Sequence, residues 1–198
     1  MNDQGTKTIE TERLIIRKFT MDDAEGMYNN WATDTETCKR LSWDVHKNVD
    51  ETRELISKWI ANYEKPYYYN WIVELKETKE VIGNINVANC HPQYKTAQMG
   101  YCYGSRYWGK GYATEALTAV LRYLVLEVGF NLVEAMCRVQ NDKSRGVMER
   151  SGMKLDGVLR NRFIDLSDGT VCDAAYYSIT KSDIELWNGK RIRTKSKI

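Results

Sequence analysis

The stretch SRYWGKGYATEAL, residues 105–117, joins a glycine turn to the start of a helix-forming run. Gly109 and Gly111 let the backbone turn tightly and bring several N–H groups toward one point. The first turn of the following helix adds N–H groups that have no intrahelical acceptor, together with the positive end of the helix dipole. This combination predicts a binding site for a phosphate group.

Other interpretations of this turn fit the surrounding sequence less well. A nucleotide-triphosphate P-loop requires Gly-Lys-Ser/Thr, whereas Tyr112 follows the second glycine here. A dinucleotide-binding fingerprint requires a third glycine where Thr114 stands and an early βαβ unit, but three strand-like runs precede the turn. A turn that merely joins a strand to a helix leaves Arg106 and the Asn141–Ser144 spacing unexplained.

The length and composition of the chain indicate a single globular domain. The 198 residues are 42% hydrophobic and 28% charged, and the formal net charge of +2 argues against nucleic-acid binding. No apolar run approaches the roughly 18 residues that would cross a bilayer, and the N-terminus lacks an apolar signal-peptide core. Five scattered cysteines without a Cys-x-x-Cys pair indicate reduced thiols in a cytoplasmic protein. With two histidines only, we expect no metal site.

Apolar periodicity predicts one α+β domain over residues 10–182, followed by a basic tail at 183–198 that we expect to be disordered in part. Strands are expected at 12–19, 69–75, 80–89, 97–103, 132–139, 154–165 and 170–180. Helices are expected after the caps Thr20, Asp50 and Asp142, and over 113–128. The predicted order is a strand, two helices, three strands, a helix, a strand, a helix and two strands.

Five sequence blocks in order resemble the GNAT superfamily of acyl-CoA N-acyltransferases. RYWGKG matches the pyrophosphate signature of that superfamily, Arg/Gln-x-x-Gly-x-Gly/Ala. The blocks TERLIIRKFTMDDAE, EVIGNI, MGYCYGSRYWGKGYATEAL, NDKSRGVMERSGMKLDGVLR and DGTVCDAAYYSI together resemble its RimJ/RimL-like branch, the ribosomal-protein N-terminal acetyltransferases. The resemblance extends from about Glu12 to Thr180, which is nearly the whole chain.

The resemblance implies a mostly antiparallel sheet of six to seven strands, flanked by about four helices and splayed after its fourth strand. Acetyl-CoA would lie in the resulting cleft, with MGYCYG (99–104) as the fourth strand beside its pantetheine arm. For Arg106 and Lys110, a phosphate contact and a solvated turn position both remain open. The implied cosubstrate-binding residues are Tyr101, Tyr103, Arg106, Tyr107, Trp108, Gly109, Lys110, Gly111, Tyr112, Ala113, Thr114, Asn141 and Ser144.

Amine acetylation needs a neutral amine, donors for the oxyanion and a proton for the departing thiolate. By resemblance, a backbone N–H near Cys102 serves the oxyanion, while the Cys102 thiol is interpreted as packing. Asn141 would hold the pantetheine and Ser144 would act near the sulfur, with ordinary helix capping as the alternative for both. Asp165 is the carboxylate nearest the expected general base, and deprotonation through water remains equally open. Glu115 is expected to complement the helix N-terminus.

The acceptor is not identified by the sequence. Trp31, Trp43 and the tyrosines at 67–69 are candidates to line an amine pocket, and Trp59 is expected in the core. The implied reaction is direct attack of a primary amine, either a protein N-terminal α-amine or a small-molecule amine, in a ternary complex. No metal, nucleic-acid or membrane partner is expected, and a homodimer is left open. The alternative function is a non-catalytic sensor that binds acyl-CoA.

Overall fold

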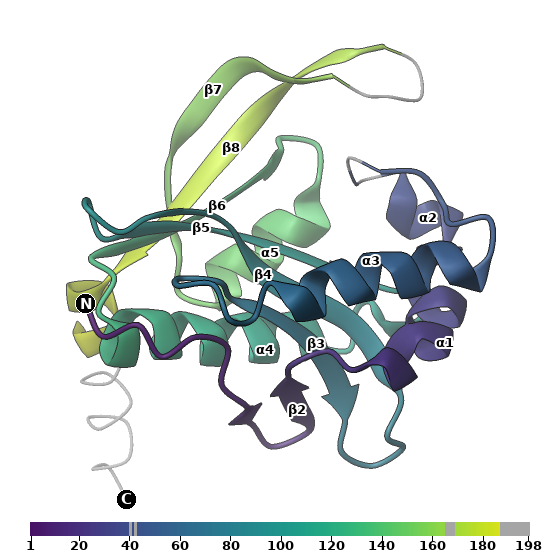
Figure 1. Ribbon diagram of the computed structural model, residues 1–198. Helices are drawn as coiled ribbons and strands as arrows, with labels where there is room; N and C mark the ends of the chain where they lie inside the picture. The colour runs from purple at the N-terminus through teal and green to yellow at the C-terminus, as the bar shows by residue number, and fades with distance from the viewer. Residues whose placement is uncertain (40, 42, 165–168, 187–198) are drawn as a thin grey trace, which may run out of the picture.

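The alternating apolar runs pair into one sheet with the order β1-β2-β3-β4-β5-β6-β8-β7 in the computed structural model (Figure 1). The structure describes residues 1–39, 41, 43–164 and 169–186. The strands are β1 (Ile9–Glu10), β2 (Leu14–Arg17), β3 (Asn70–Leu75), β4 (Val81–His91), β5 (Thr96–Tyr103), β6 (Leu132–Arg138), β7 (Lys154–Ile164) and β8 (Val171–Thr180). The sheet thus has eight strands rather than six to seven, because the two-residue β1 pairs with β2 at Ile9 and Ile16.

The sheet opens on one side of β5. All pairings are antiparallel except that of β5 with β6, which are parallel from Thr96 and Leu132 to Met99 and Ala135. Beyond Met99, the described residues of β6 no longer pair with β5, although β5 continues to Tyr103. The expected splay is therefore present, and it follows the fifth strand because β1 adds one strand to the count.

Helices cover both faces of the sheet. The labelled helices are α1 (Ala24–Met27), α2 (Thr35–Cys38), α3 (Val49–Ala61), α4 (Tyr112–Arg122) and α5 (Asp142–Arg150), and α4 continues as a wider π-helical segment, Tyr123–Val128. Residues 181–186 are also helical. One core packs α4 against the sheet and includes Leu117 and Val120. The other core lies under α1 and α3 and includes Trp31 and Ile56. No helix among the described residues is long and apolar enough to cross a membrane.

Two predicted helix caps are wrong by one or two residues. Asn48 caps α3, since its side chain accepts a hydrogen bond from the N–H of Glu51, and Asp50 lies inside the first turn. Asn141 caps α5, and Asp142 is the first helical residue. Both aspartates still place a carboxylate near a helix N-terminus, where the dipole favours negative charge. The Thr20 cap is confirmed, because Thr20 and Asp23 form a capping box.

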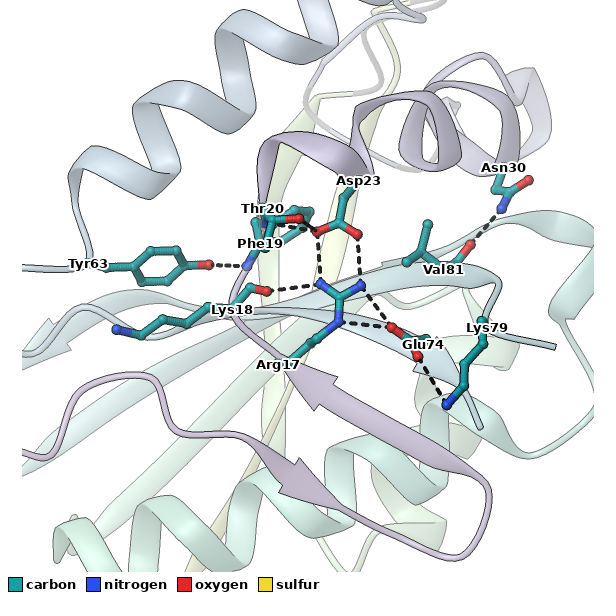
Figure 2. Close-up of polar contacts among 10 residues, drawn as sticks. All are labelled: Arg17, Lys18, Phe19, Thr20, Asp23, Asn30, Tyr63, Glu74, Lys79 and Val81. Carbon is teal, nitrogen blue, oxygen red and sulfur yellow. Dashed lines mark hydrogen bonds and ion pairs between the residues drawn. The ribbon is translucent and has the colours of Figure 1, made fainter. Parts of the chain in front are cut away.

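A partly buried ion network holds the α1 segment against the sheet. Arg17 on β2 donates two hydrogen bonds of 2.8 Å to Asp23 and one of 2.9 Å to Glu74 on β3, as Figure 2 shows. The two carboxylate side chains are 5% and 12% exposed. Next to this network, Asn30 donates to the carbonyl of Val81 over 2.6 Å. These contacts fix the position of the α1 segment on the sheet.

The β7–β8 hairpin extends beyond the rest of the sheet (Figure 1). Most of β7 is exposed, and its pairing with β8 shifts between Leu159 and Phe163. Within that bulge Asn161 has a positive φ of 58°, and its N–H donates to a carboxylate oxygen of Asp173 over 2.9 Å. Bulges of this kind bend a strand and interrupt its free edge. The domain boundary at residue 182 stays a prediction, and Ile184 beyond it is fully buried.

Candidate active site

A cavity of about 1690 Å³ lies where β5 and β6 separate. Its walls come from the open half of β5, the end of β6, the glycine loop, the N-terminal half of α5 and the far end of the β7–β8 hairpin. The charged residues among its described lining are all cations: Arg138, Lys143 and Arg150. Such a lining favours an anionic ligand.

The glycine loop presents unsatisfied donors to this cavity. Gly109 and Gly111 have positive φ values of 76° and 83°, a conformation that residues with a side chain rarely adopt. Within the described chain, the N–H groups of residues 109–114 have no backbone acceptor outside the helix ladder. Arg13 donates to the carbonyl of Lys110 over 3.0 Å, and its guanidinium stacks 4.7 Å from the Tyr112 ring centroid. The carbonyl of Lys110 in the loop is therefore hydrogen-bonded to Arg13, while the backbone N–H groups of the loop are free to bind a ligand.

All but two of the predicted cosubstrate residues line the cavity. Those that do are Tyr101, Tyr103, Tyr107, Trp108, Gly109, Gly111, Tyr112, Ala113, Thr114, Asn141 and Ser144. Arg106 instead pairs with Glu80 at 2.9 Å and donates to Asn30 at 2.7 Å. The Lys110 ammonium lies 5.8 Å from the Tyr107 ring centroid. Neither side chain lines the cavity among the described residues, so this structure favours the turn role for both.

Ser144 and Tyr101 form a polar pair between α5 and β5. The hydroxyl oxygen of Tyr101 lies 2.7 Å from Oγ of Ser144, and the N–H of Ser144 donates to Oδ1 of Asn141 over 3.2 Å. Burial raises the pKa of Tyr101, so its phenol stays protonated and can donate. Asn141 thus performs the capping role, while the Ser144 hydroxyl faces the cavity with a donor beside it.

Cys102 is packed as a neutral thiol. Its Sγ donates to Oδ1 of Asn84 over 2.9 Å, and burial raises its pKa to about 12. A thiol with such a pKa is not a nucleophile near neutral pH. Asp165, the predicted base, lies outside the described residues. Glu115 accepts from Thr11 at 2.6 Å and pairs with Arg13 at 2.7 Å, which fixes it near the start of α4.

The far end of the cavity is aromatic and rich in amides. Trp43, Tyr68 and Tyr69 line it as predicted. Tyr67 does not line it and packs against the main core instead, and Trp31 is fully buried in the core under α1. Trp59 also lines the cavity, against the expectation of a pure core position, because its ring packs on Phe19 but the residue is only partly buried.

Sequence reasoning missed the amide side chains of this region, Asn62, Asn70, Asn84, Asn86 and Gln98. Asn84 and Asn86 are separated by one residue in the strand sequence GNINVAN, and residues at that spacing share one face of a strand. That alternation was a usable signal. Among the described residues, no group of three or more His, Cys, Asp or Glu side chains could hold a metal ion, and the five cysteines carry no disulfide.

Comparison with known proteins identifies relatives of the whole domain. Residues 13–154 match the family model described as an acetyltransferase (GNAT) domain. The chain is 28% identical over 173 residues to the uncharacterized N-acetyltransferase YoaA of Bacillus subtilis, covering 87% of this chain and 96% of the relative. It is 26% identical over 184 residues to the ribosomal protein uS5 alanine N-acetyltransferase of Escherichia coli, covering 88% and 91%.

Solved structures share the same fold. A GNAT-family acetyltransferase from Bacillus anthracis superposes with a TM-score of 0.77 at 28% identity, covering 89% of this chain and 99% of that one. RimL, a ribosomal-protein acetyltransferase solved in complex with coenzyme A, superposes with a TM-score of 0.78 at 19% identity, covering 88% of this chain and 98% of that one. The second likeness concerns the fold alone.

Proposed function

The chain belongs to the GNAT family of acetyltransferases, and on that premise we propose that it acetylates a primary amine by direct attack in a ternary complex. It is an acetyl-CoA-dependent N-acetyltransferase. For the acceptor we propose a protein N-terminal α-amine, with a small-molecule amine as the second candidate. The names of several relatives as ribosomal-protein acetyltransferases support the first choice.

The observation that carries this proposal is the continuity of the cavity from the glycine loop to Ser144. A Cβ added at Gly109 would meet nothing within 4 Å, so the loop borders open space with its free amides. Loop amides, the N-terminus of α4 and the cationic lining suit a diphosphate. The unpaired edge of β5 beyond Met99 suits an extended arm with amide groups.

Acetyl-CoA supplies the acetyl group as an activated thioester. In the proposed mechanism, a free N–H of β5 near Cys102 stabilises the oxyanion. Tyr101 donates to the Ser144 hydroxyl, which leaves the hydrogen of Ser144 free to protonate the departing thiolate. The attacking amine loses its proton to water or to Asp165. The aromatic and amide end of the cavity receives the acceptor.

A thiol-release assay with acetyl-CoA and a panel of peptides and small amines tests the function directly. We expect turnover with peptides that carry a free α-amine, and much less with the same peptides after N-terminal blocking. Release of the coenzyme A thiol only when an acceptor amine is present would exclude the non-catalytic sensor. Binding of acetyl-CoA without turnover on any amine of the panel would contradict the proposal and favour that sensor.

The cosubstrate site is tested by Gly109→Asp, with Gly169→Asp as the matched control. Both glycines have nearly the same φ, 76° and 74°, and neither would bring a new Cβ within 4 Å of another group. Of the two glycines, Gly109 itself lines the cavity and Gly169 does not. We expect acetyl-CoA to raise the melting temperature of the parent and of Gly169→Asp, but not of Gly109→Asp, because the new carboxylate repels the diphosphate.

The proton donor is tested by a double-mutant cycle. Ser144→Ala should lower kcat by about 10²-fold with little change in acetyl-CoA affinity, because the lost interaction forms only as the thiolate leaves. Tyr101→Phe should lower kcat by about tenfold in the parent. In the Ser144→Ala variant the same change should cause no further loss of kcat. Additive losses would show that Tyr101 acts independently of Ser144. Unchanged kinetics in Ser144→Ala would reduce Ser144 to its structural role in α5.

A further inference from the structure

Arg150 lies where two hollows of the surface meet. It is the last residue of α5, and it lines both the main cavity and a neighbouring groove of about 470 Å³ between α4 and α5. Gly111 and Thr114 also line both. The end of the glycine loop, the first turn of α4 and the Arg150 guanidinium therefore border one continuous surface.

The guanidinium of Arg150 folds back along its own helix. A Cβ added at Gly146, one turn earlier, would lie 2.8 Å from Nη1 and 3.3 Å from Nη2 of Arg150. The guanidinium of Arg150 can occupy this position on the helix surface because residue 146 is a glycine and has no Cβ. Further toward the start of the helix, the Lys143 ammonium lies 4.2 Å from the Trp108 ring centroid, on the cavity side.

Arg150 is a cation without a counterion in the part of the chain that the structure describes. None of the described hydrogen bonds or ion pairs involves the Arg150 guanidinium, and Arg150 is exposed to solvent. The other charges that line the groove are engaged: Glu115 pairs with Arg13 at 2.7 Å, and Arg122 has a partner. Burial alone would raise the pKa of Glu115, but hydrogen bonds from Thr11 and Arg13 and the charge of Arg13 keep that pKa below its ordinary value. The groove thus offers an uncompensated positive charge.

We propose that Arg150 binds the phosphomonoester on the ribose 3′ position of coenzyme A. A guanidinium binds phosphate oxygens through two parallel N–H donors, and an exposed one needs no rearrangement to do so. With the diphosphate on the glycine loop, the adenosine end reaches the groove, whose wall at Thr118 and Ala119 carries no charge. Arg150 then makes the protein select acetyl-CoA over thioesters that lack this phosphate. The inference rests on the proposed cosubstrate site.

The test compares two ligands and three proteins. Dissociation constants for acetyl-CoA and acetyl-3′-dephospho-CoA are measured by calorimetry with the parent, Arg150→Gln and Arg160→Gln. Arg160 is the matched control, an exposed arginine on β7 that lines neither hollow. We expect the parent and Arg160→Gln to bind acetyl-CoA at least tenfold more tightly than the dephospho ligand. In Arg150→Gln the ratio should fall below about threefold, while the affinity for the dephospho ligand stays within twofold.

A second variant moves the guanidinium without removing it. In Gly146→Ala the new Cβ displaces the flexible end of Arg150, while alanine favours the helix more than glycine does. We expect the ligand ratio to fall in the same direction as in Arg150→Gln, with an unchanged or higher melting temperature.

Equal affinity of the parent for both ligands, or equal weakening of both in Arg150→Gln, would overturn the assignment of the 3′-phosphate. If the parent binds neither ligand, the proposed cosubstrate site fails together with this inference. The pattern across the two ligands therefore separates the two failures.

Discussion

Replacing Arg17 with methionine should destabilise the fold strongly, because it removes the one described cation that pairs with buried Asp23 and leaves Glu74 with only Lys79, at 3.8 Å. The methionine keeps most of the apolar stem and removes the guanidinium that joins β2, the Asp23 turn and β3 (Figure 2). The Asp23 side chain, 5% exposed, would then lose its ion-pair partner, and the Glu74 side chain, 12% exposed, would keep only the longer contact with Lys79. Breaking one side of a buried pair costs about 3–5 kcal/mol.

Arg53→Met is the matched control for this loss. Arg53 also pairs with two carboxylates, Glu25 at 2.7 Å and Asp50 at 2.8 Å, but those side chains are 60% and 81% exposed. Exposed pairs contribute at most about 1 kcal/mol, since water and salt screen them. Arg17 itself is 26% exposed, so we take the lower figure of about 3 kcal/mol for Arg17→Met. For a chain of this size that corresponds to a fall in melting temperature of roughly 6–12 °C.

Urea denaturation followed by tryptophan fluorescence, together with thermal melting, measures both variants. We expect Arg17→Met to lose several times more free energy of unfolding than Arg53→Met. Adding Asp23→Asn and Glu74→Gln to Arg17→Met should recover part of the loss, because neutral amides are cheaper to bury than charges. Equal losses in Arg17→Met and Arg53→Met, or no recovery in the triple variant, would refute the reasoning.

Three further predictions follow from local geometry and charge. Gly104→Ala should lower the free energy of unfolding by at least about 2 kcal/mol in urea titrations, because the added Cβ would lie 2.0 Å from the backbone carbonyl oxygen of Asn30. Cys102 should resist iodoacetamide at pH 8 in the native protein and react only after denaturation, since its pKa is about 12; rapid native alkylation on a peptide map would contradict this. Glu115, whose pKa is lowered in the fold, stabilises the protein above its unfolded pKa and loses that contribution as the pH falls. Glu115→Gln should therefore lower the melting temperature at pH 7, with a difference that shrinks toward pH 3; a pH-independent difference would point to packing instead.

Local sequence patterns were sufficient for the elements and for the phosphate-binding loop. The glycine spacing at Gly109 and Gly111 predicted a tight turn, and both residues have the positive φ that such a turn uses, because only the backbone of a few adjacent residues is involved. The apolar patterns likewise predicted strands at 69–75 and 80–89, where the structure has the antiparallel pair of β3 and β4. The errors at Asp50 and Asp142 are errors of one or two positions, since Asn and Asp both satisfy a helix start.

The environment of each aromatic side chain depended on partners far along the chain. Trp31 and Trp59 look alike as aromatics in helical segments, but Trp31 is fully buried while Trp59 borders the cavity. Their difference arises from the way α1 and α3 pack on the sheet, which the Arg17 network helps to set. No local pattern encodes that arrangement.

What the sequence by itself determined was the fold class, the family and the loop that suits a diphosphate, because these depend on short-range patterns of residues. Only the tertiary structure decided which side chains face the cavity. Arg106 forms an ion pair with Glu80, and Tyr101 on β5 forms a hydrogen bond with Ser144 on α5. Arg150 lies beside the glycine loop without a described counterion. The physical reason is that charge, burial and hydrogen bonding of a side chain are properties of its neighbours in space, and those neighbours here are separated by up to dozens of residues in the chain.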